Sequence, residues 1–579
     1  MRSPLHSALL VTVAAACVLL PGIGSAPLWD EDEPKNAACS LAMLDSGDWV
    51  VPTFNSDLRV EKPPLVNWVQ LAGISLLGRT EAGIRIGSAI LTIGSCLLSL
   101  WLGRLLAGPL VGLLTGLIMA SCIWTAIGGR AATPDAPLVF CTTLAAAIFV
   151  HAIHRGIPTK ISWWHAIGIG VACGFATLAK GPVGVALPLA AFVALFWWQT
   201  TVPADGRLAR LQAAVAGVRP LTITSAAVAI ALPWYLLVTL RTGGRWLEEF
   251  VLVHNVGRFT APMEGHDGTL LYYPAIIALG LFPWSLVILA VPLHAWFTWR
   301  STSHTDTRRL PVAFATCWAG VWVGTFSLAG TKLPGYIWPA YPALALATAS
   351  YLSDWLNGQT GWEHRLWRRL SPGLVMHLGW ASLGIVGCVF FVGLPLIARR
   401  FAPGHEWLGL IGLVPIAAAG LAATCQQKQQ PRLALATLAT SAVCLLALLG
   451  GLAAVSFSRH QGTAGLIAAI PPAARSGNWA GLHPIRPSLV FYTGRTVGSL
   501  PDATACLEHL RSTPSARLVI PSDRLAELLP KLPADCRLLS VRPASFDPGL
   551  AVIGRTDTPA NDTLAQQPIT FRPDRLERF

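Results

Sequence analysis

The sequence predicts an all-α polytopic membrane protein of about thirteen transmembrane helices, followed by a small α/β domain. Three observations lead to this fold class. Hydrophobic residues make up 53% of the 579 residues, charged residues only 12%, and the mean hydropathy is +0.55, whereas soluble proteins carry about 25% charged residues. Apolar runs recur along residues 1–456, and each is long enough to cross a hydrocarbon core about 30 Å thick. Beyond residue 456 the runs stop and a mixed sequence follows.

The apolar runs are expected to be helices, because lipid offers no partner for an unpaired backbone amide. In chain order they cover residues 5–26, 85–106, 109–127, 136–154, 163–179, 182–199, 221–240, 271–299, 311–329, 335–353, 374–397, 406–424 and 433–456. The first run ends in Gly24-Ser25-Ala26, which is similar to a signal-peptide cleavage site. An uncleaved helix and a cleaved signal peptide both stay open at this point, and in either case the next segment faces outward.

The net charge of +13 is distributed as the positive-inside rule requires for a membrane protein. With a cytoplasmic N-terminus, nearly every inward loop is basic; these loops carry Arg104, Arg155, Lys160, Arg207, Arg210, Arg219, Arg300, Arg308, Arg309, Arg365, Arg368, Arg369, Lys428 and Arg432. Outward loops hold almost all the acidic residues, and Arg399 and Arg400 are the clear exception to the rule. We therefore expect the membrane as a partner and no nucleic acid.

The segment 457–579 is expected to form a separate α/β domain, and thirteen crossings place it outside the cytoplasm. Short β-type runs alternate there with helical stretches. The expected strands are Ser488–Tyr492, Arg517–Ile520 and Leu550–Ile553, and the expected helices are Ala503–Arg511 and Arg524–Leu529.

The first outward loop, residues 27–84, is long and rich in acidic residues, and long loops that are not linkers are usually functional. It opens with Trp29-Asp30-Glu31-Asp32-Glu33. Adjacent carboxylates raise one another's pKa and attract cations, so the string predicts a catalytic base or a metal ligand. A solvated acidic cap on the first helix is the alternative interpretation.

A second motif of this loop is Glu61-Lys62-Pro63-Pro64. The two prolines restrict the backbone just before an apolar stretch, Leu65–Leu77. The acid and the base would then be held at the level of the lipid headgroups. An ordinary surface ion pair is the simpler alternative.

Six segments together resemble the ArnT-like and protein-O-mannosyltransferase-like superfamily of bacterial membrane glycosyltransferases. The segments are DEPKNAACSLAMLDSGDWVVPTFNSDLRVEKPPLVNW (32–68), GRAATPDAPL (129–138), LAKGPVGVALP (178–188), FVLVHNVGRF (250–259), YYPAIIALGLFPW (272–284) and GTKLPGYIWPAYPALAL (330–346). The resemblance implies a GT-C fold over residues 1–456, with an uncleaved first helix. It also implies transfer of a sugar from a polyprenyl-phosphate donor at the outer face of the inner membrane, and it places the C-terminal domain in the periplasm.

The resemblance also implies roles for particular residues. Its catalytic acid falls on Asp32, followed by Glu33, and Asp30 competes because the acidic string permits a two-residue shift. Asp135 matches a further acidic position. The residues that it implies for the donor phosphate are Lys62, Lys180, Arg258, Lys332 and Tyr336.

The cations of these motifs, together with Arg130, all fall on outward loops. Each one alone is more often an interfacial side chain that extends to the headgroups. Together they predict a clamp for an anionic donor, because fixed cations stabilise the charge that develops on a departing phosphate.

Glu61 and His254 are the residues that would hold a divalent metal ion, if the enzyme uses one. Two departures from the family pattern, at Pro34-Lys35 and around His254-Asn255, leave the metal and the sugar open.

Several points therefore stay open: the sugar is a 4-amino-4-deoxy-L-arabinose-like sugar or a hexose, and the acceptor is lipid A, a protein or another envelope glycan. A transporter or flippase of lipid-linked sugars and a non-catalytic envelope assembly protein are the alternative functions. Transporters usually carry ionisable groups at the bilayer midplane and often show repeated halves. The sequence shows neither feature, which favours an enzyme at the outer interface.

Overall fold

The computed structural model describes residues 3–199, 206–263, 265–301, 306–360, 371–458, 462–542 and 549–555. The chain divides into two compact units, Met1–His460 and Gln461–Phe579. Each unit has a hydrophobic core of its own.

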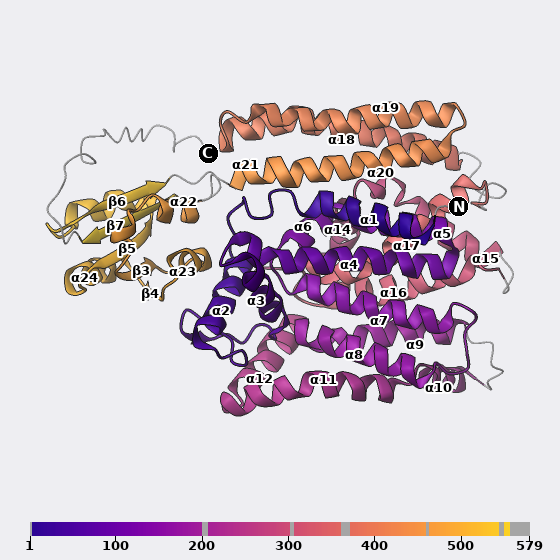
Figure 1. Cartoon of the computed structure of the whole chain (residues 1–579), viewed down its shortest axis with the longest axis horizontal. Helices are drawn as coiled ribbons and strands as arrows, with labels where there is room; N and C mark the ends of the chain where they lie inside the picture. Colours follow the sequence, from indigo (N-terminus) through magenta and orange to yellow (C-terminus); the bar gives the residue numbers. More distant parts are fainter. Residues whose placement is uncertain are drawn as a thin grey trace. The chain divides into compact units, whose positions relative to one another are not determined.

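The first unit is a bundle of long apolar helices that run side by side (Figure 1). Its longer helices are α1 (Pro4–Leu19), α4 (Glu81–Ala107), α5 (Pro109–Ala120), α6 (Ile123–Arg130), α7 (Asp135–Ile153), α8 (Trp163–Lys180), α9 (Val183–Gln199), α10 (Arg207–Val218), α11 (Pro220–Arg241), α16 (Arg309–Leu328), α17 (Tyr341–Leu356), α18 (Pro372–Phe401), α19 (Leu413–Gln427) and α20 (Pro431–Leu448). The remaining pieces are α12 (Arg245–Val251), the π-helix η1 (Leu252–Gly257), α13 (Arg258–Thr260), α14 (Tyr272–Gly280), η2 (Trp284–Val287), α15 (Ala290–Ser301), η3 (Pro334–Ala340), η4 (Glu406–Gly412), the π-helix η5 (Leu449–Ala453) and α21 (Ala454–Ser458).

The helical, multi-pass character predicted from the sequence is confirmed, but fewer helices than thirteen are long and apolar enough to span a membrane. Among the described residues, seven helices meet that standard, or eight if α5 and α6, bent by 58°, form one span. Three shorter apolar helices, α1, α3 (Leu65–Leu77) and α9, fall below it.

Proline explains where the expected spans are interrupted. The run 271–299 is divided into α14, η2 and α15, and Pro283 lies at the break before η2. Proline has no N–H for the helical ladder and clashes with the preceding turn. The run 335–353 begins as a 3₁₀-helix, η3, which contains Pro339, and becomes α-helical only at Tyr341.

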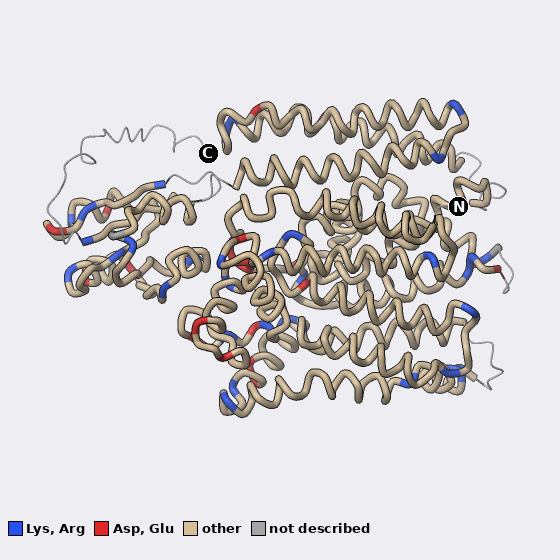
Figure 2. Tube along the Cα trace, viewed as in Figure 1, with Lys and Arg blue, Asp and Glu red and all other residues tan. Residues whose placement is uncertain are grey.

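One end of the bundle carries the long first loop (Figure 1). This loop forms the helix α2 (Asp32–Ser46), the two-residue strands β1 (Thr53–Phe54) and β2 (Asp57–Leu58), and the helix α3. α2 ends at Gly47, whose φ of 71° is the left-handed conformation of a helix C-cap. Acidic and basic residues gather toward the two ends of the bundle, and few lie in between (Figure 2).

The second unit is a five-stranded mixed sheet with the order β4-β3-β5-β7-β6. Its strands are β3 (Asn478–Leu482), β4 (Val497–Leu500), β5 (Ala516–Pro521), β6 (Cys536–Arg542) and β7 (Leu550–Arg555), and its helices include α22 (Gly462–Ala468), α23 (Pro487–Thr493), α24 (Ala503–Ser512) and α25 (Leu525–Leu528). β3 pairs in parallel with β4 and β5, whereas β7 pairs antiparallel with β5 and β6.

The sequence prediction for this unit is right for two strands and wrong for one. Arg517–Ile520 and Leu550–Ile553 lie within β5 and β7, but Ser488–Tyr492 lies within the helix α23. Pro487 occupies the first position of that helix, where its fixed φ favours helical geometry. Gly494, with φ of 62°, ends the helix.

Candidate active site

Two neighbouring acids at the start of α2 have opposite surroundings. Glu33 is 5% exposed, and Arg85 of α4 donates two hydrogen bonds to its carboxylate, of 2.8 and 2.7 Å. The backbone N–H groups of Trp29 and Ala132 donate two more, each of 2.9 Å. The Glu33 carboxylate therefore joins α2, α4 and the segment before α7. Asp32, in contrast, is exposed.

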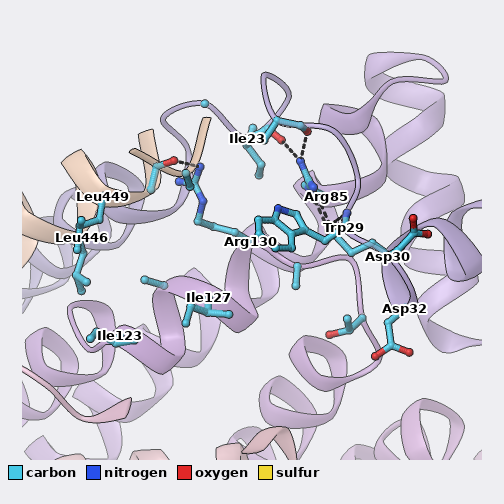
Figure 3. Close-up of a pocket in the computed structure, with 18 of the residues that line it drawn as sticks. Ile23, Trp29, Asp30, Asp32, Arg85, Ile123, Ile127, Arg130, Leu446 and Leu449 are labelled. Atoms are coloured by element: carbon cyan, nitrogen blue, oxygen red, sulfur yellow. Dashed lines mark hydrogen bonds and ion pairs between the residues drawn. The ribbon is translucent and has the colours of Figure 1, made fainter. Parts of the chain in front are cut away.

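Asp32 lies at the mouth of a cavity of about 610 Å³. Figure 3 shows Asp30 and Asp32 at one end of this cavity and the apolar side chains of Leu446 and Leu449 at the other. The remaining walls include Ile123 and Ile127 of α6 and the guanidinium groups of Arg85 and Arg130. The cavity is thus acidic at one end and apolar at the other, which suits an amphiphilic molecule.

A second, smaller cavity of about 100 Å³ brings together cations from separate parts of the chain. Lys62 comes from the loop before α3, Lys180 from the end of α8 and Arg258 from the start of α13. Tyr336 of η3 completes the group: Arg258 Nη1 donates to its hydroxyl at 3.4 Å, and Lys180 Nζ lies 4.9 Å from its ring centre. Convergent cations and a phenol are the chemistry that binds a phosphate. We name this the cationic pocket, lined by Lys62, Lys180, Arg258 and Tyr336.

The electrostatics of Lys62 reflect this crowding. Burial and the like charges of Lys180 and Arg258 lower the pKa of Lys62 from 10.5 to about 8, while Asp32 and Asp135 act in the opposite direction. The ammonium group of Lys62 is therefore repelled by its cationic neighbours, and a bound anion would offset that repulsion. Since the charge of Asp32 acts on Lys62, the acid of the larger cavity lies near the cationic pocket.

Asp135, at the first position of α7, forms an ion pair with Lys180. Both side chains are largely buried, 21% and 14% exposed. A Cβ at Gly335 would lie 3.1 Å from the Asp135 carboxylate, so a side chain at this position of η3 would crowd that carboxylate. Asp135 therefore orients Lys180 toward Tyr336, which is a positioning role in this structure.

Glu61 faces cations rather than a metal site. Lys35 Nζ lies 2.5 Å from Oε1 of Glu61 and Arg59 Nε lies 3.3 Å from Oε2. Burial opposes ionisation of Glu61, but Arg59 and Lys35 outweigh it and lower its pKa to about 2.

His254 lines the cationic pocket from η1. Within the described part of the chain, no group of three or more His, Cys, Asp and Glu side chains is arranged to hold a metal ion. Among these residues, Glu61 and His254 do not form part of such a group and do not fit a metal centre.

Two cations that the sequence suggested for the phosphate are engaged elsewhere. Lys332 is 7% exposed, and its Nζ donates to the carbonyl groups of Ser327 and Ala329, at 3.2 and 2.7 Å. It thus caps the end of α16. Arg130 donates to backbone carbonyls at the end of α1, including that of Pro21 at 2.6 Å, and to that of Gly450 at 3.0 Å.

Sequence reasoning missed a buried polar network beneath α2. Arg59 Nη2 donates to Oδ1 of Asn36 at 2.6 Å. Asn36 and Gln70 both donate to the carbonyl of Ala132, at 3.1 and 3.2 Å. The network fixes the segment that leads to Asp135 against α2 and α3. Ser40 and Asn67 are the other members of the network. The spacing of Asn36 and Ser40 by four in α2, and of Asn67 and Gln70 by three in α3, could have indicated this network in the sequence, because residues at such spacings lie on one face of a helix.

The Glu33–Arg85 pair supplies a prediction on stability. Glu33→Gln leaves Arg85 buried without its charged partner, so we expect the protein to lose about 3–5 kcal/mol of stability. The thermal unfolding transition of the purified protein measures this loss. Asp45→Asn is the matched control, because Asp45 and its partner Arg79 are 56% and 54% exposed and an exposed pair contributes about 0–1 kcal/mol. Equal transitions for the two variants would contradict a structural role for Glu33.

The chain is similar in sequence to known proteins. The sequence pattern of the dolichyl-phosphate-mannose-protein mannosyltransferase (PMT) family matches residues 8–247. An undecaprenyl phosphate-alpha-4-amino-4-deoxy-L-arabinose arabinosyl transferase from Edwardsiella ictaluri is 31% identical over 336 residues, which cover 58% of this chain and 57% of that protein. The enzyme of the same name from Pseudomonas savastanoi pv. phaseolicola is 28% identical over 407 residues, 70% of this chain and 71% of its own.

The fold is also that of a solved structure. ArnT from Cupriavidus metallidurans bound to undecaprenyl phosphate superposes with a TM-score of 0.74 at 21% identity, over 96% of this chain and 98% of that one. The apo state of the same protein gives a TM-score of 0.72. The chain is thus similar to the PMT family over residues 8–247, similar in sequence to undecaprenyl phosphate-alpha-4-amino-4-deoxy-L-arabinose arabinosyl transferases, and similar in fold to ArnT.

Proposed function

We propose that this protein transfers a sugar from a polyprenyl-phosphate carrier to a lipid acceptor of the cell envelope. The observation that carries the proposal is the cationic pocket, where Lys62, Lys180, Arg258 and Tyr336 converge near the exposed carboxylate of Asp32. The relatives named as 4-amino-4-deoxy-L-arabinose arabinosyl transferases favour that sugar over a hexose. An amphiphilic cavity beside Asp32 favours a lipid, such as lipid A, over a protein as the acceptor.

The proposed reaction uses only side chains of this chain. The donor phosphate lies in the cationic pocket, and the acceptor hydroxyl lies at the acidic end of the larger cavity. Asp32 takes the proton of that hydroxyl while its oxygen attacks the anomeric carbon. The bond between this carbon and the phosphate oxygen breaks, and the polyprenyl phosphate departs with the electron pair. Lys62, Lys180 and Arg258 stabilise the charge on the leaving phosphate.

The proposal includes a topology. The proposed crossings are α1, α4, the bent pair α5–α6, α7, α8, α9, α11, the divided run α14–η2–α15, α16, η3–α17, α18, η4–α19 and α20–α21, which makes thirteen. This number places α2, α3 and the second unit in the periplasm, outside the inner membrane. It also places the basic loops on the cytoplasmic side, as the positive-inside rule requires.

A transporter is favoured less, because the ionisable groups of the site lie at helix ends. Asp32 and Asp135 begin α2 and α7, and Lys180 ends α8. Transport pathways usually place such groups at the bilayer midplane, in broken helices.

A transfer assay tests the proposal directly. The purified protein in liposomes is given radiolabelled undecaprenyl-phosphate sugars together with an envelope lipid extract. We expect label from an aminoarabinose donor to move into the lipid fraction, and a protease added to sealed spheroplasts to cleave the second unit. Wild-type protein that transfers nothing from a broad donor panel would refute the activity, and a fully protected second unit would refute the topology.

A further inference from the structure

Two arginines at one end of α18, Arg399 and Arg400, take no part in the proposed site. Both occupy the last turn of α18 and are exposed. In the proposed topology this end faces outward, where positive charge is uncommon. The next element, η4, carries Trp407, whose side chain is 48% exposed. Indole rings of this kind are typical of the membrane–water interface.

The same end of the hairpin formed by α18 and α19 lies close to the larger cavity. η4 packs against η5, and Leu449 and Gly450 of η5 form part of the cavity wall. A Cβ at Gly451 would lie 2.9 Å from Pro21, a few residues before the acidic string. The backbone at this end of the hairpin is coloured as basic in Figure 2. η4, which packs against both α18 and η5, thus connects the arginine-bearing helix to the wall of the cavity.

Next to the arginines, the last turns of α18, η4 and the first turn of α19 present an apolar surface. The exposed side chains there are Leu396 (58%), Ile397 (45%), Leu410 (57%) and Leu413 (46%). Cations above an apolar surface, with a tryptophan at the boundary, complement a lipid whose headgroup carries phosphate. A neutral lipid would gain nothing from the two charges.

We propose that Arg399 and Arg400 capture the phosphate headgroup of an anionic membrane lipid on its way into the larger cavity. The proposal rests on the proposed function, in which this cavity receives the lipid acceptor. Arginines in the last turn also stabilise the helix through its dipole, so the test must separate charge recognition from folding.

The kinetic test uses the full-length protein in liposomes. We expect Arg399→Gln with Arg400→Gln to raise the KM for an anionic glycolipid acceptor roughly 10- to 30-fold. The kcat and the KM for the donor should stay unchanged, because neither arginine touches the cationic pocket. Arg399→Lys with Arg400→Lys keeps the charge and should retain the wild-type KM. Lys428→Gln with Arg432→Gln removes two exposed cations, one at the end of α19 and one at the start of α20, and should leave all constants unchanged. An unchanged acceptor KM in the double glutamine variant would overturn the capture site.

A binding measurement keeps this result distinct from the proposed function. Native mass spectrometry counts the molecules of phosphatidylglycerol and of phosphatidylcholine that remain bound to each variant. We expect the glutamine pair to lose phosphatidylglycerol selectively and the Lys428/Arg432 pair to retain it. Selective loss in a protein that transfers no sugar would support the capture site and refute the activity. Active protein whose variants bind phosphatidylglycerol equally would refute the capture site alone.

Discussion

Asp32→Asn is expected to lower the rate of sugar transfer by about 10²–10⁴-fold, the usual contribution of a positioned general base. The amide has nearly the shape of the carboxylate but does not accept a proton. Because Asp32 is exposed at the first position of α2, the substitution removes no buried contact, so the fold should be preserved. Single-turnover rates with saturating donor and acceptor measure the effect.

Asp30→Asn is the matched control for this experiment. Asp30 also lines the larger cavity and is the alternative to which a two-residue shift of the acidic string would assign catalysis. We expect Asp30→Asn to retain most of the turnover. Loss in Asp30→Asn with retention in Asp32→Asn would transfer the catalytic role to Asp30, and retention in both would exclude base catalysis by this string.

Lys62→Met is expected to lower kcat/KM for the donor roughly 30- to 150-fold, which corresponds to the loss of about 2–3 kcal/mol from one charge-assisted contact with phosphate. Methionine keeps most of the length of the unbranched side chain and removes the charge. The effect should be specific to the donor, because Lys62 lines the cationic pocket. Lys35→Met is the control: Lys35 is paired with Glu61 and lies outside the lining of this pocket, so its loss should affect donor binding little.

Lys62 also predicts a pH dependence. Burial and the neighbouring Lys180 and Arg258 lower its pKa to about 8, so its charge is present below pH 8 and is lost as the pH rises through that value. We therefore expect kcat/KM for the donor to fall above about pH 8 in the wild type. Lys62→Arg, which stays charged, should remove this decline. A decline that persists unchanged in Lys62→Arg would assign the titration to another group.

The residues of the cationic pocket show how much of the site could be predicted from the sequence. Lys62, Lys180, Arg258, Lys332 and Arg130 all fall on outward loops by hydropathy alone, and the family resemblance selects four of them as phosphate ligands. The structure brings three of these four together, whereas Lys332 caps α16 through backbone carbonyls. Whether such a cation can bind a phosphate or instead caps a helix depends on where its side chain points and which carbonyl groups lie nearby. Neither can be predicted from its position in a loop.

The acids at the start of α2 show the same limit. Asp32 and Glu33 are adjacent in the sequence and similar in chemistry. In a helix, neighbouring side chains point about 100° apart, and only the position of Arg85, 52 residues later in the chain, decides which acid is buried as an anchor. The exposed one is the residue that we propose for catalysis.

The membrane environment and the helical class of the fold follow from the sequence. Runs of apolar residues in a chain with few charges require membrane helices, because lipid satisfies no backbone group. The charge asymmetry of the loops predicts which loops face outward, and the resemblance of six motifs predicts a GT-C fold. The positions where helices break, the charged side chains that meet in the cationic pocket and those that act as anchors became known from the tertiary structure. These features depend on contacts between residues far apart in the chain, and such contacts cannot be predicted from the local sequence.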